Sequence, residues 1–214
     1  MAGIVEEHVE EFLRDLYQKE KGVLRRLRAI CEEEDLPILE RESARVLHFL
    51  VAAQKPRRIL ELGTCLGYSA ALMAHASGCE ELITIEHWPS RAIRAKAYLR
   101  GLPQIQVLEG DAFSHMKTLS PGFDTIFIDA AKAQYLHYWE ESRRLLAPGG
   151  MIIFDDVLYQ GMLSNKKLFK RRKITIVKRL KKLLVTISND EAWKSCILPV
   201  GDGMLVVKEN DEAR

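Results

Sequence analysis

Beyond Pro56, short apolar runs alternate with longer amphipathic stretches, and this alternation constrains the fold more than any other feature of the sequence. The apolar runs have the length and β-branched content of buried strands, and the stretches between them carry apolar residues at helical spacing. Parallel strands need such helical crossovers, which cover both faces of the sheet. The pattern predicts an α/β fold with strands at 58–62, 82–86, 105–108, 125–129 and 151–155.

The two ends of the chain differ from this pattern. Residues 1–55 predict helices, because apolar residues recur there at helical spacing and prolines interrupt them. Near the other end, the apolar runs 195–199 and 204–208 flank an Asp-Gly pair at Asp202, which predicts a hairpin. We therefore expect a single domain, residues 1–214, whose mostly parallel sheet ends in an antiparallel pair.

The composition is that of an ordinary folded chain. With 214 residues, of which 47% are hydrophobic and 29% charged, it can bury a sizeable core. No apolar run approaches the ~20 residues of a membrane helix, and the acidic, amphipathic start does not resemble a secretory signal. The cysteines share no metal-ligand spacing; they are Cys31, Cys65, Cys79 and Cys196. We therefore expect a cytoplasmic protein without a membrane partner.

Charge is strongly segregated along the chain. The basic segment, residues 157–189, contains ten lysines and arginines and no acidic residue. The rest of the chain carries 22 basic and 30 acidic residues, a formal net charge of −8. A concentrated patch of this kind favours a polyanionic partner. The plainer alternative is a solvated helix face, because the apolar residues between the lysines recur at roughly helical spacing.

Candidate ligand-binding residues follow the strands, because ligands of open α/β sheets bind beyond the carboxyl ends of the strands. The first strand leads into a turn, residues 61–69, that contains Gly63 and Gly67 and ends in a serine. The second strand ends in Glu86, 23 residues after Gly63, an offset at which a carboxylate can bind ribose hydroxyls. The third leads to Asp111.

The same turn argues against a dinucleotide enzyme. The middle glycine of G-x-G-x-x-G is missing, and Glu61 would repel a diphosphate. A cofactor with a ribose and a positive centre, such as S-adenosylmethionine (SAM), suits these carboxylates better. A turn that merely joins a strand to a helix is the plain alternative, but Glu86 and Asp111 at their positions favour the cofactor.

Three carboxylates end two strands of the predicted sheet. They are Asp129, Asp155 and Asp156. Carboxylates held close together repel one another unless a cation compensates, and a hard cation such as Mg²⁺ prefers oxygen ligands. Independent helix caps are the alternative. Lys132 favours the metal, because a cation there could orient or deprotonate a substrate hydroxyl.

Taken together, these segments resemble the class I SAM-dependent O-methyltransferases of the metal-dependent catechol and caffeoyl-CoA type. The resemblance covers residues 36–208 and rests on 59–69, 127–135, 155–158 and 198–203. It implies a Rossmann-like, seven-stranded methyltransferase sheet, mostly parallel with a C-terminal antiparallel hairpin and with helices on both faces. Members are often dimers, which makes the N-terminal helices candidates for packing against a second subunit.

The resemblance also implies roles for individual residues. Gly63 and Ser69 would hold the methionine part of SAM, and Glu86 the ribose. The full implied cofactor set is Leu39, Glu61, Gly63, Ser69, Glu86, Asp111, Ala112 and Asp129. The divalent cation would be held by Asp129, Asp155 and Asp156, where the family usually has Asn at the third position. Asp129 and Lys132 are the candidate catalytic residues.

Within this family the chain most resembles the bacterial tRNA 5-hydroxyuridine methyltransferases, which form 5-methoxyuridine at the wobble position of the anticodon loop. The resemblance lies in residues 127–135 and in the basic segment, where the family varies its substrate-recognition loop. Positive charges there suit RNA phosphates. The candidate RNA-binding residues are Lys170, Arg171, Arg172, Lys173, Lys178 and Arg179. Tyr135, Tyr159 or Trp193 could stack on the base, although a place in the core explains Trp193 equally well.

Two other functions remain open at this point. One is the same chemistry on a small catechol-like or phenylpropanoid-CoA substrate, which does not need the basic segment. The other is an RNA-binding module that has lost catalysis, against which the glycine turn, Glu86 and the carboxylates argue. In the tRNA interpretation, the cation would lower the pKa of the 5-hydroxyl. Lys132 would assist proton removal or stabilise the oxyanion.

Overall fold

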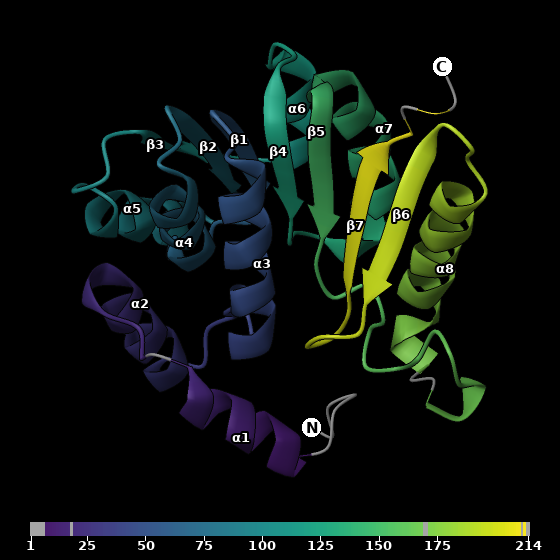
Figure 1. Ribbon diagram of the computed structural model, residues 1–214, viewed down its shortest axis with the longest axis horizontal. Coiled ribbons are helices and arrows are strands. Elements are labelled where there is room, and N and C mark those ends of the chain that lie inside the picture. Colours follow the sequence, from purple (N-terminus) through teal and green to yellow (C-terminus); the bar gives the residue numbers. More distant parts are fainter. Residues whose placement is uncertain (1–6, 18, 169–170, 211, 213–214) are drawn as a thin grey trace.

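The computed structural model describes residues 7–17, 19–168, 171–210 and 212. Within them, seven strands form one sheet in the order β3-β2-β1-β4-β5-β7-β6 (Figure 1). The first five in the sequence pair in parallel, and β7 pairs antiparallel with both β5 and β6. The predicted fold class is confirmed. The strands are β1 (Arg58–Leu62), β2 (Glu81–Glu86), β3 (Ile105–Glu109), β4 (Phe123–Ile128), β5 (Leu146–Phe154), β6 (Trp193–Leu198) and β7 (Met204–Glu209).

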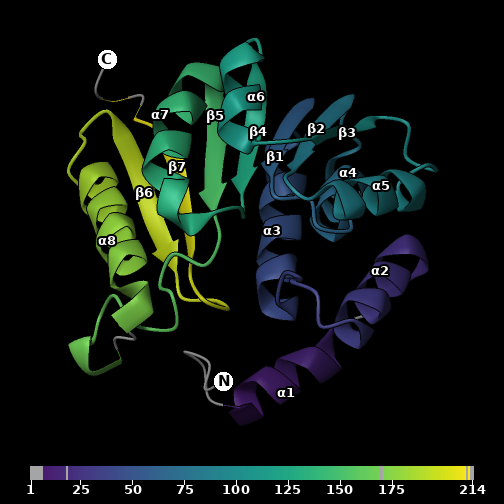
Figure 2. The same ribbon diagram turned by 180° about the vertical axis from the view of Figure 1, so that it is seen from behind.

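Helices cover both faces of the sheet, as Figures 1 and 2 show from opposite sides. Side chains alternate along each central strand, so Phe127 packs into one layer while Ile126 and Ile128 pack into the other. The first layer contains α2 to α5 and the second α6 to α8. The helices are α1 (Glu7–Leu16), α2 (Gly22–Glu33), α3 (Arg41–Gln54), α4 (Tyr68–Ser77), α5 (Pro89–Tyr98), α6 (Ala112–Thr118), α7 (Tyr135–Leu145) and α8 (Ile174–Ser188).

The largest difference from the sequence prediction is at β5. The strand begins at Leu146, five residues before the predicted start, because Leu146 already pairs with Phe123 of β4. Its first residues are not an apolar run, and the pairing passes through a register shift. Backbone pairing can extend beyond the apolar residues that a hydrophobic pattern detects.

The N-terminal helices lie where they were predicted. In both views α1 and α2 lie at the edge of the sheet where the parallel strands end, as does the segment between β5 and α8 (Figures 1 and 2). The apolar face of α1 is uncovered, with Phe12 63% and Leu16 64% exposed. In the described part of the chain, no helix combines the length and the apolar character needed to cross a membrane.

The basic segment contains both a helix that packs against the core and an exposed group of positive charges. After β5 the chain forms two short 3₁₀ helices, η2 (Lys166–Leu168) and η3 (Arg171–Lys173), and then α8. The apolar face of α8 is buried in the core of the second layer; its buried residues are Val177, Leu180, Leu183 and Ile187. The charged side chains face outwards; Arg171, Arg172, Lys178, Arg179, Lys181 and Lys182 are exposed. Lys170 lies outside the described residues.

Candidate functional site

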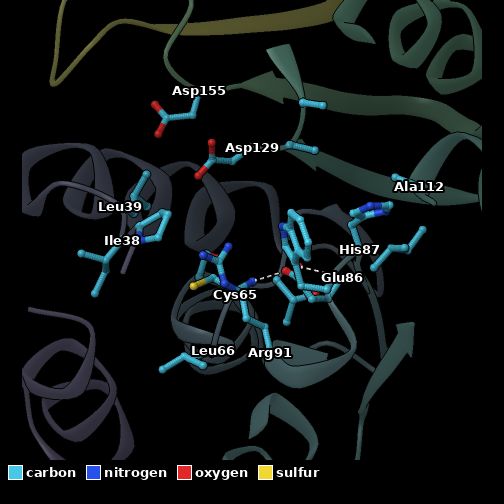
Figure 3. A pocket seen from close by; sticks show the side chains of 18 of the residues that line it. Ile38, Leu39, Cys65, Leu66, Glu86, His87, Arg91, Ala112, Asp129 and Asp155 are labelled. Carbon is cyan, nitrogen blue, oxygen red and sulfur yellow. Dashed lines mark hydrogen bonds between the residues drawn. The ribbon is translucent and has the colours of Figure 1, made fainter. Parts of the chain in front are cut away.

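A cavity of about 640 Å³ lies beyond the carboxyl ends of the parallel strands (Figure 3). Its lining comes from the segments that follow β1, β2, β3, β4 and β5, and from Pro37, Ile38 and Leu39 between α2 and α3. The volume is within the range of small-molecule and cofactor sites. The cavity is therefore the candidate active site, at the place that the strand-end rule indicates.

The turn at residues 61–69, called the glycine turn below, forms the part of the cavity wall that follows β1. Gly63 has a φ of +101°, and a Cβ added there would lie 2.0 Å from the carbonyl oxygen of Asp129. Gly67 has a φ of +92°, and a Cβ would lie 2.5 Å from Leu99 Cδ1. Only glycine fits at both positions, so the turn can pass close to β4 and to α5. Ser69, in the first turn of α4, lines the cavity beside Gly63.

Glu86 is held at the cavity by two backbone groups. Its Oε2 accepts a hydrogen bond from Cys65 N at 2.7 Å, and its Oε1 accepts one from Trp88 N at 2.9 Å (Figure 3). A carboxylate can accept about four hydrogen bonds, so capacity remains for the hydroxyls of a ligand. The residue predicted to bind ribose is therefore fixed in orientation before any ligand arrives.

Glu61 differs from the other predicted cofactor residues, because its carboxylate lies behind the lining of the cavity. The side chain is fully buried. Thr84 Oγ1 donates to Oε2 at 2.5 Å, and Oε1 has no hydrogen-bond partner among the described residues. Burial raises the pKa of Glu61 to about 8, although the hydrogen bond from Thr84 acts in the opposite direction. A buried carboxyl oxygen without a partner suits a positively charged ligand nearby, and SAM carries two such centres.

The other predicted cofactor residues line the cavity from different sides. Leu39 is buried on the α2–α3 side, and Ala112 lies at the start of α6. Asp111 also caps α6, because its Oδ1 accepts hydrogen bonds from Ser114 N at 2.9 Å and Ser114 Oγ at 2.8 Å. These hydrogen bonds lower the pKa of Asp111, so the carboxylate at the cavity is ionised. Asp111 therefore caps α6 and lines the cavity with the same side chain.

The three carboxylates converge as predicted. Asp129, Asp155 and Asp156 present oxygens that all lie within 4.8 Å of one another. Asp155 is 3% exposed, and its Oδ1 has no hydrogen-bond partner within the described ranges. Burial, together with the charges of Asp129 and Asp156, raises the pKa of Asp155 to about 9. A cluster of hard oxygen ligands with an unsatisfied buried oxygen fits a divalent cation.

Backbone geometry explains the residue type at position 156. Asp156 has a φ of +56°, in the left-handed region that Asn and Asp tolerate better than other residues with a side chain. The Asn that the family usually carries there and the Asp of this chain therefore fit the same backbone. The difference between them is one negative charge at the cluster.

Lys132 is a positively charged side chain that contacts the carboxylate cluster. Its Nζ lies 2.8 Å from Asp156 Oδ2 and 3.6 Å from Asp129 Oδ1. Burial alone would lower the pKa of Lys132, but attraction to Asp129 and Asp156 outweighs it and raises the pKa above its ordinary value. Lys132 is thus held protonated, which favours a role in stabilising an oxyanion over a role as a base.

Two of the candidate RNA-binding residues contact elements of the site. Arg179 Nη1 donates to Ala133 O at 2.8 Å, in the 3₁₀ helix η1 (Lys132–Gln134) that also carries Lys132. Lys173 Nζ lies 4.9 Å from the centre of the Tyr159 ring, three residues beyond Asp156. The basic segment therefore begins directly beside the carboxylates.

Of the three aromatic residues considered for stacking on the base, Tyr135 was wrongly predicted, Trp193 takes the alternative place in the core, and stacking by Tyr159 is unsupported. Tyr135 is 1% exposed and donates its hydroxyl proton to Asp155 O at 2.9 Å. Trp193 begins β6 at the opposite edge of the sheet and packs edge-on against Trp139. Tyr159 is buried beneath Lys173. Apolar and aromatic character in the sequence did not distinguish core residues from ligand contacts.

Several residues of the cavity were not predicted as site residues. His87 and Trp88 follow Glu86 at the rim and pack edge to face with ring centres 5.3 Å apart. The others lie on helices, where the strand-end rule gives no signal; they include Cys31, Arg91, Gln134 and Tyr138. His87 and Trp88 lie one and two residues beyond the end of β2, so the strand-end rule could have predicted them as site residues.

Comparison with known proteins identifies the chain at the level of a family. The sequence profile of the family described as O-methyltransferase matches residues 15–210. The chain belongs to this family. It is a SAM-dependent O-methyltransferase. The glycine turn, Glu86 and the carboxylate cluster line the candidate active site of this O-methyltransferase.

Individual relatives support this assignment. The catechol O-methyltransferase of Niastella koreensis is 33% identical to the O-methyltransferase described here over 170 residues, 75% of this chain and 77% of the relative. A Staphylococcus aureus structure, provisionally described as a caffeoyl-CoA O-methyltransferase, has a TM-score of 0.87 at 28% identity and covers 95% of this chain and 100% of its own. The O-methyltransferase TomG of Streptomyces achromogenes, solved with SAM, has a TM-score of 0.82 and covers 95% of this chain and 96% of its own. At 24% identity it shows the shared fold.

Proposed function

We propose that this O-methyltransferase transfers the SAM methyl group to the 5-hydroxyl of 5-hydroxyuridine at the tRNA wobble position, with the help of a divalent cation such as Mg²⁺. The observation that carries the proposal is the basic segment, which begins at the carboxylate cluster and reaches the site through Arg179 and Lys173. The product would be 5-methoxyuridine.

The cofactor is held by residues that already line the cavity. We assign the methionine part to Gly63 and Ser69, the ribose to Glu86 and the adenine edge to Asp111 and Ala112. The prearranged Glu86 carboxylate supports this assignment, because an oriented acceptor binds two hydroxyls without first losing conformational freedom. Leu39 closes the apolar side of the cavity and excludes water from the reacting groups.

The acceptor hydroxyl is placed beside the carboxylate cluster. Asp129, Asp155 and Asp156 are the residues that would hold the cation. A divalent cation bound there supplies a Lewis acid that lowers the pKa of the acceptor hydroxyl. Lys132, held protonated by Asp156 and Asp129, adds a positive charge that stabilises the developing oxyanion. Holding this oxyanion in line with the methyl group supplies most of the rate enhancement.

The exposed charges of the basic segment bind the phosphates around the target base. Arg171, Arg172, Lys178 and Arg179 are exposed, and Arg179 contacts η1, which contributes Lys132 and Gln134 to the cavity lining. Each phosphate neutralised releases condensed counterions, so binding is expected to weaken steeply with salt. The wobble base lies in a loop and can turn into the cavity without unpairing a helix.

A second candidate function is methylation of a catechol-like or phenylpropanoid-CoA substrate. The observation in its favour is the similarity to relatives described as catechol and caffeoyl-CoA O-methyltransferases. It uses the same cavity and carboxylate cluster, and it leaves the charge of the basic segment without a role unless the CoA phosphates bind there.

Methyl transfer from labelled SAM distinguishes the two candidates. The acceptors are tRNA carrying 5-hydroxyuridine and, in parallel, a catechol, each with Mg²⁺ and with EDTA. Label in the tRNA that EDTA abolishes is the expected result. Label only in the catechol would overturn the tRNA proposal and leave the second candidate.

We also propose that the chain forms a homodimer. The uncovered apolar face of α1, with Phe12 and Leu16 exposed, supports this proposal, because burial of such side chains is a common driving force for association. Light scattering coupled to size-exclusion chromatography should give the mass of two chains, and Phe12→Glu should give the mass of one.

A further inference from the structure

Two cysteines from distant parts of the sequence meet in the wall of the cofactor cavity. Cys31 lies near the end of α2 and is 1% exposed, whereas Cys65 lies in the glycine turn and is partly exposed. Both line the cavity, and their thiols are hydrogen-bonded to each other. The proposed methyl transfer uses neither thiol.

The pair joins two parts of the cavity lining that are far apart in the sequence. On one side, Leu36 N donates to Cys31 O at 2.9 Å, so Cys31 is directly connected to the lid segment, residues 37–39, which lines the cavity. On the other side, Cys65 N donates to Glu86 Oε2 at 2.7 Å (Figure 3). A covalent bond between the two sulfurs would therefore fix the lid segment to the wall that carries Glu86.

Positive charge surrounds the pair. The pKa of Cys31 is lowered by the hydrogen bond with Cys65 and by the nearby Arg28 and Arg94 guanidinium groups. The pKa of Cys65 is raised above its ordinary value by the hydrogen bond with Cys31 and by burial, although Arg91 acts in the opposite direction, so Cys31 is the thiol of the pair that ionises first. Cations that stabilise a thiolate increase cysteine reactivity towards oxidants.

We propose that Cys31 and Cys65 form a reversible disulfide that fixes the lid segment over the cavity and slows the exchange of cofactor and product. The oxidant is a peroxide. One thiol loses its proton, and its thiolate attacks the peroxide and breaks the O–O bond. This forms a sulfenic acid, and the released proton joins the departing hydroxide to give water. The other thiol then displaces the sulfenic hydroxyl as a second water, which takes up the proton of that thiol, and the S–S bond forms. Two electrons pass from the sulfurs to the peroxide.

The effect on exchange follows from the connections of the two residues. A disulfide holds its sulfurs at about 2.05 Å, closer than two thiols in contact. Leu39 is buried against the cavity, so the lid segment must move for a nucleoside cofactor to enter or leave. A disulfide between the end of α2 and the glycine turn would restrict this movement and therefore slow both entry and release of the cofactor.

The first test is chemical. The purified full chain is treated with hydrogen peroxide, and its intact mass and disulfide-linked peptides are determined before and after dithiothreitol. Loss of two hydrogen atoms, with Cys31 linked to Cys65 and full reversal on reduction, is expected. Cys31→Ser and Cys65→Ser should each prevent the link, whereas the control Cys196→Ser, which changes an exposed cysteine on β6, should retain it.

The second test measures S-adenosylhomocysteine exchange by stopped-flow fluorescence, using Trp88 at the rim of the cavity as the reporter. In the oxidised wild type, association and dissociation should both slow by about tenfold, equivalent to about 1.4 kcal/mol in each barrier. In Cys65→Ser the same peroxide treatment should leave both rates as they were before oxidation. A different disulfide, sulfinic acid in place of a link, or a link without a change in exchange rates would overturn the proposal.

Discussion

The two halves of the cavity are built on different physical principles. Around β1 to β3, the cofactor half is shaped by close backbone approach at Gly63, by backbone N–H groups that hold Glu86, and by apolar residues. Around β4, β5 and α8, the acceptor half is shaped by side-chain charge: three carboxylates, Lys132 and the basic segment. The first half depends on available space, and the second depends on the balance of charge.

The largest effect should come from removing a charge from the acceptor half. In Asp155→Asn the carboxylate cluster loses a buried ligand, and methyl transfer should fall at least about a thousandfold at saturating Mg²⁺, because Lewis-acid assistance is worth several kcal/mol. Initial rates with labelled SAM measure the loss. S-adenosylhomocysteine affinity, measured by calorimetry, should stay close to that of the wild type. Equal loss of both would contradict the separation of the halves.

The next largest effect should come from a change of shape in the cofactor half. Gly63→Ala places a Cβ 2.0 Å from the Asp129 carbonyl oxygen at a φ of +101°, so the chain should lose about 3 kcal/mol of stability together with cofactor binding. The matched control is Gly78→Ala, with a φ of +63° and no atom within 4 Å of the added Cβ. It should cost about 1 kcal/mol. Urea unfolding that gives equal losses for the two variants would refute the packing argument.

The fully buried Glu61 of the cofactor half should make stability depend on pH. The pKa of Glu61 is about 8 in the folded chain against an ordinary 4.5. Between these values the folded state keeps a proton that the unfolded state has released, so its contribution to stability falls as the pH rises from 4.5 to 8. Each pKa unit is worth about 1.4 kcal/mol, and the decline should reach a few kcal/mol.

Glu61→Gln should remove this decline. Unfolding free energies of the wild type and the variant, measured across that pH range without cofactor, should differ most near pH 8, where the variant is the more stable. Parallel curves for the two proteins would mean that Glu61 is ionised in the folded state.

The smallest effect should come from the surface of the acceptor half. Arg171→Gln together with Arg172→Gln should weaken tRNA binding about tenfold and lower the salt dependence by roughly one counterion for each phosphate that is no longer neutralised. Lys96→Gln together with Arg100→Gln removes the same charge from exposed positions near the end of α5 and should have little effect. Equal weakening by both pairs would indicate that net charge, and not the basic segment, binds the RNA.

Much of the fold could be predicted because its signal is local. Each buried strand carries its own apolar run, and the Asp-Gly pair at Asp202 marks the antiparallel end of the sheet. The extension of β5 back to Leu146 could not be predicted, because it depends on pairing with Phe123 across the sheet. Local patterns give the elements, whereas their lengths are set by their neighbours.

The candidate site divides in the same way. Glu86 ends β2, Asp111 lies two residues beyond β3 and Asp155 directly follows β5, so chain topology alone brings them to one edge. Cys31 and Arg91 reach the cavity from helices, where only tertiary packing decides which side faces it. Tyr135 was wrongly predicted to stack on the base, because its side chain is buried in the core next to the site and does not face the cavity.

The central claim is that both halves act on one hydroxyl of an RNA base. The most direct measurement is mass spectrometry of nucleosides from tRNA carrying 5-hydroxyuridine, after reaction with isotopically labelled SAM and Mg²⁺. We expect labelled 5-methoxyuridine, formed at the expense of 5-hydroxyuridine and absent in EDTA and in Asp155→Asn. Unlabelled tRNA from an enzyme preparation that methylates a catechol in the same buffer would contradict the claim.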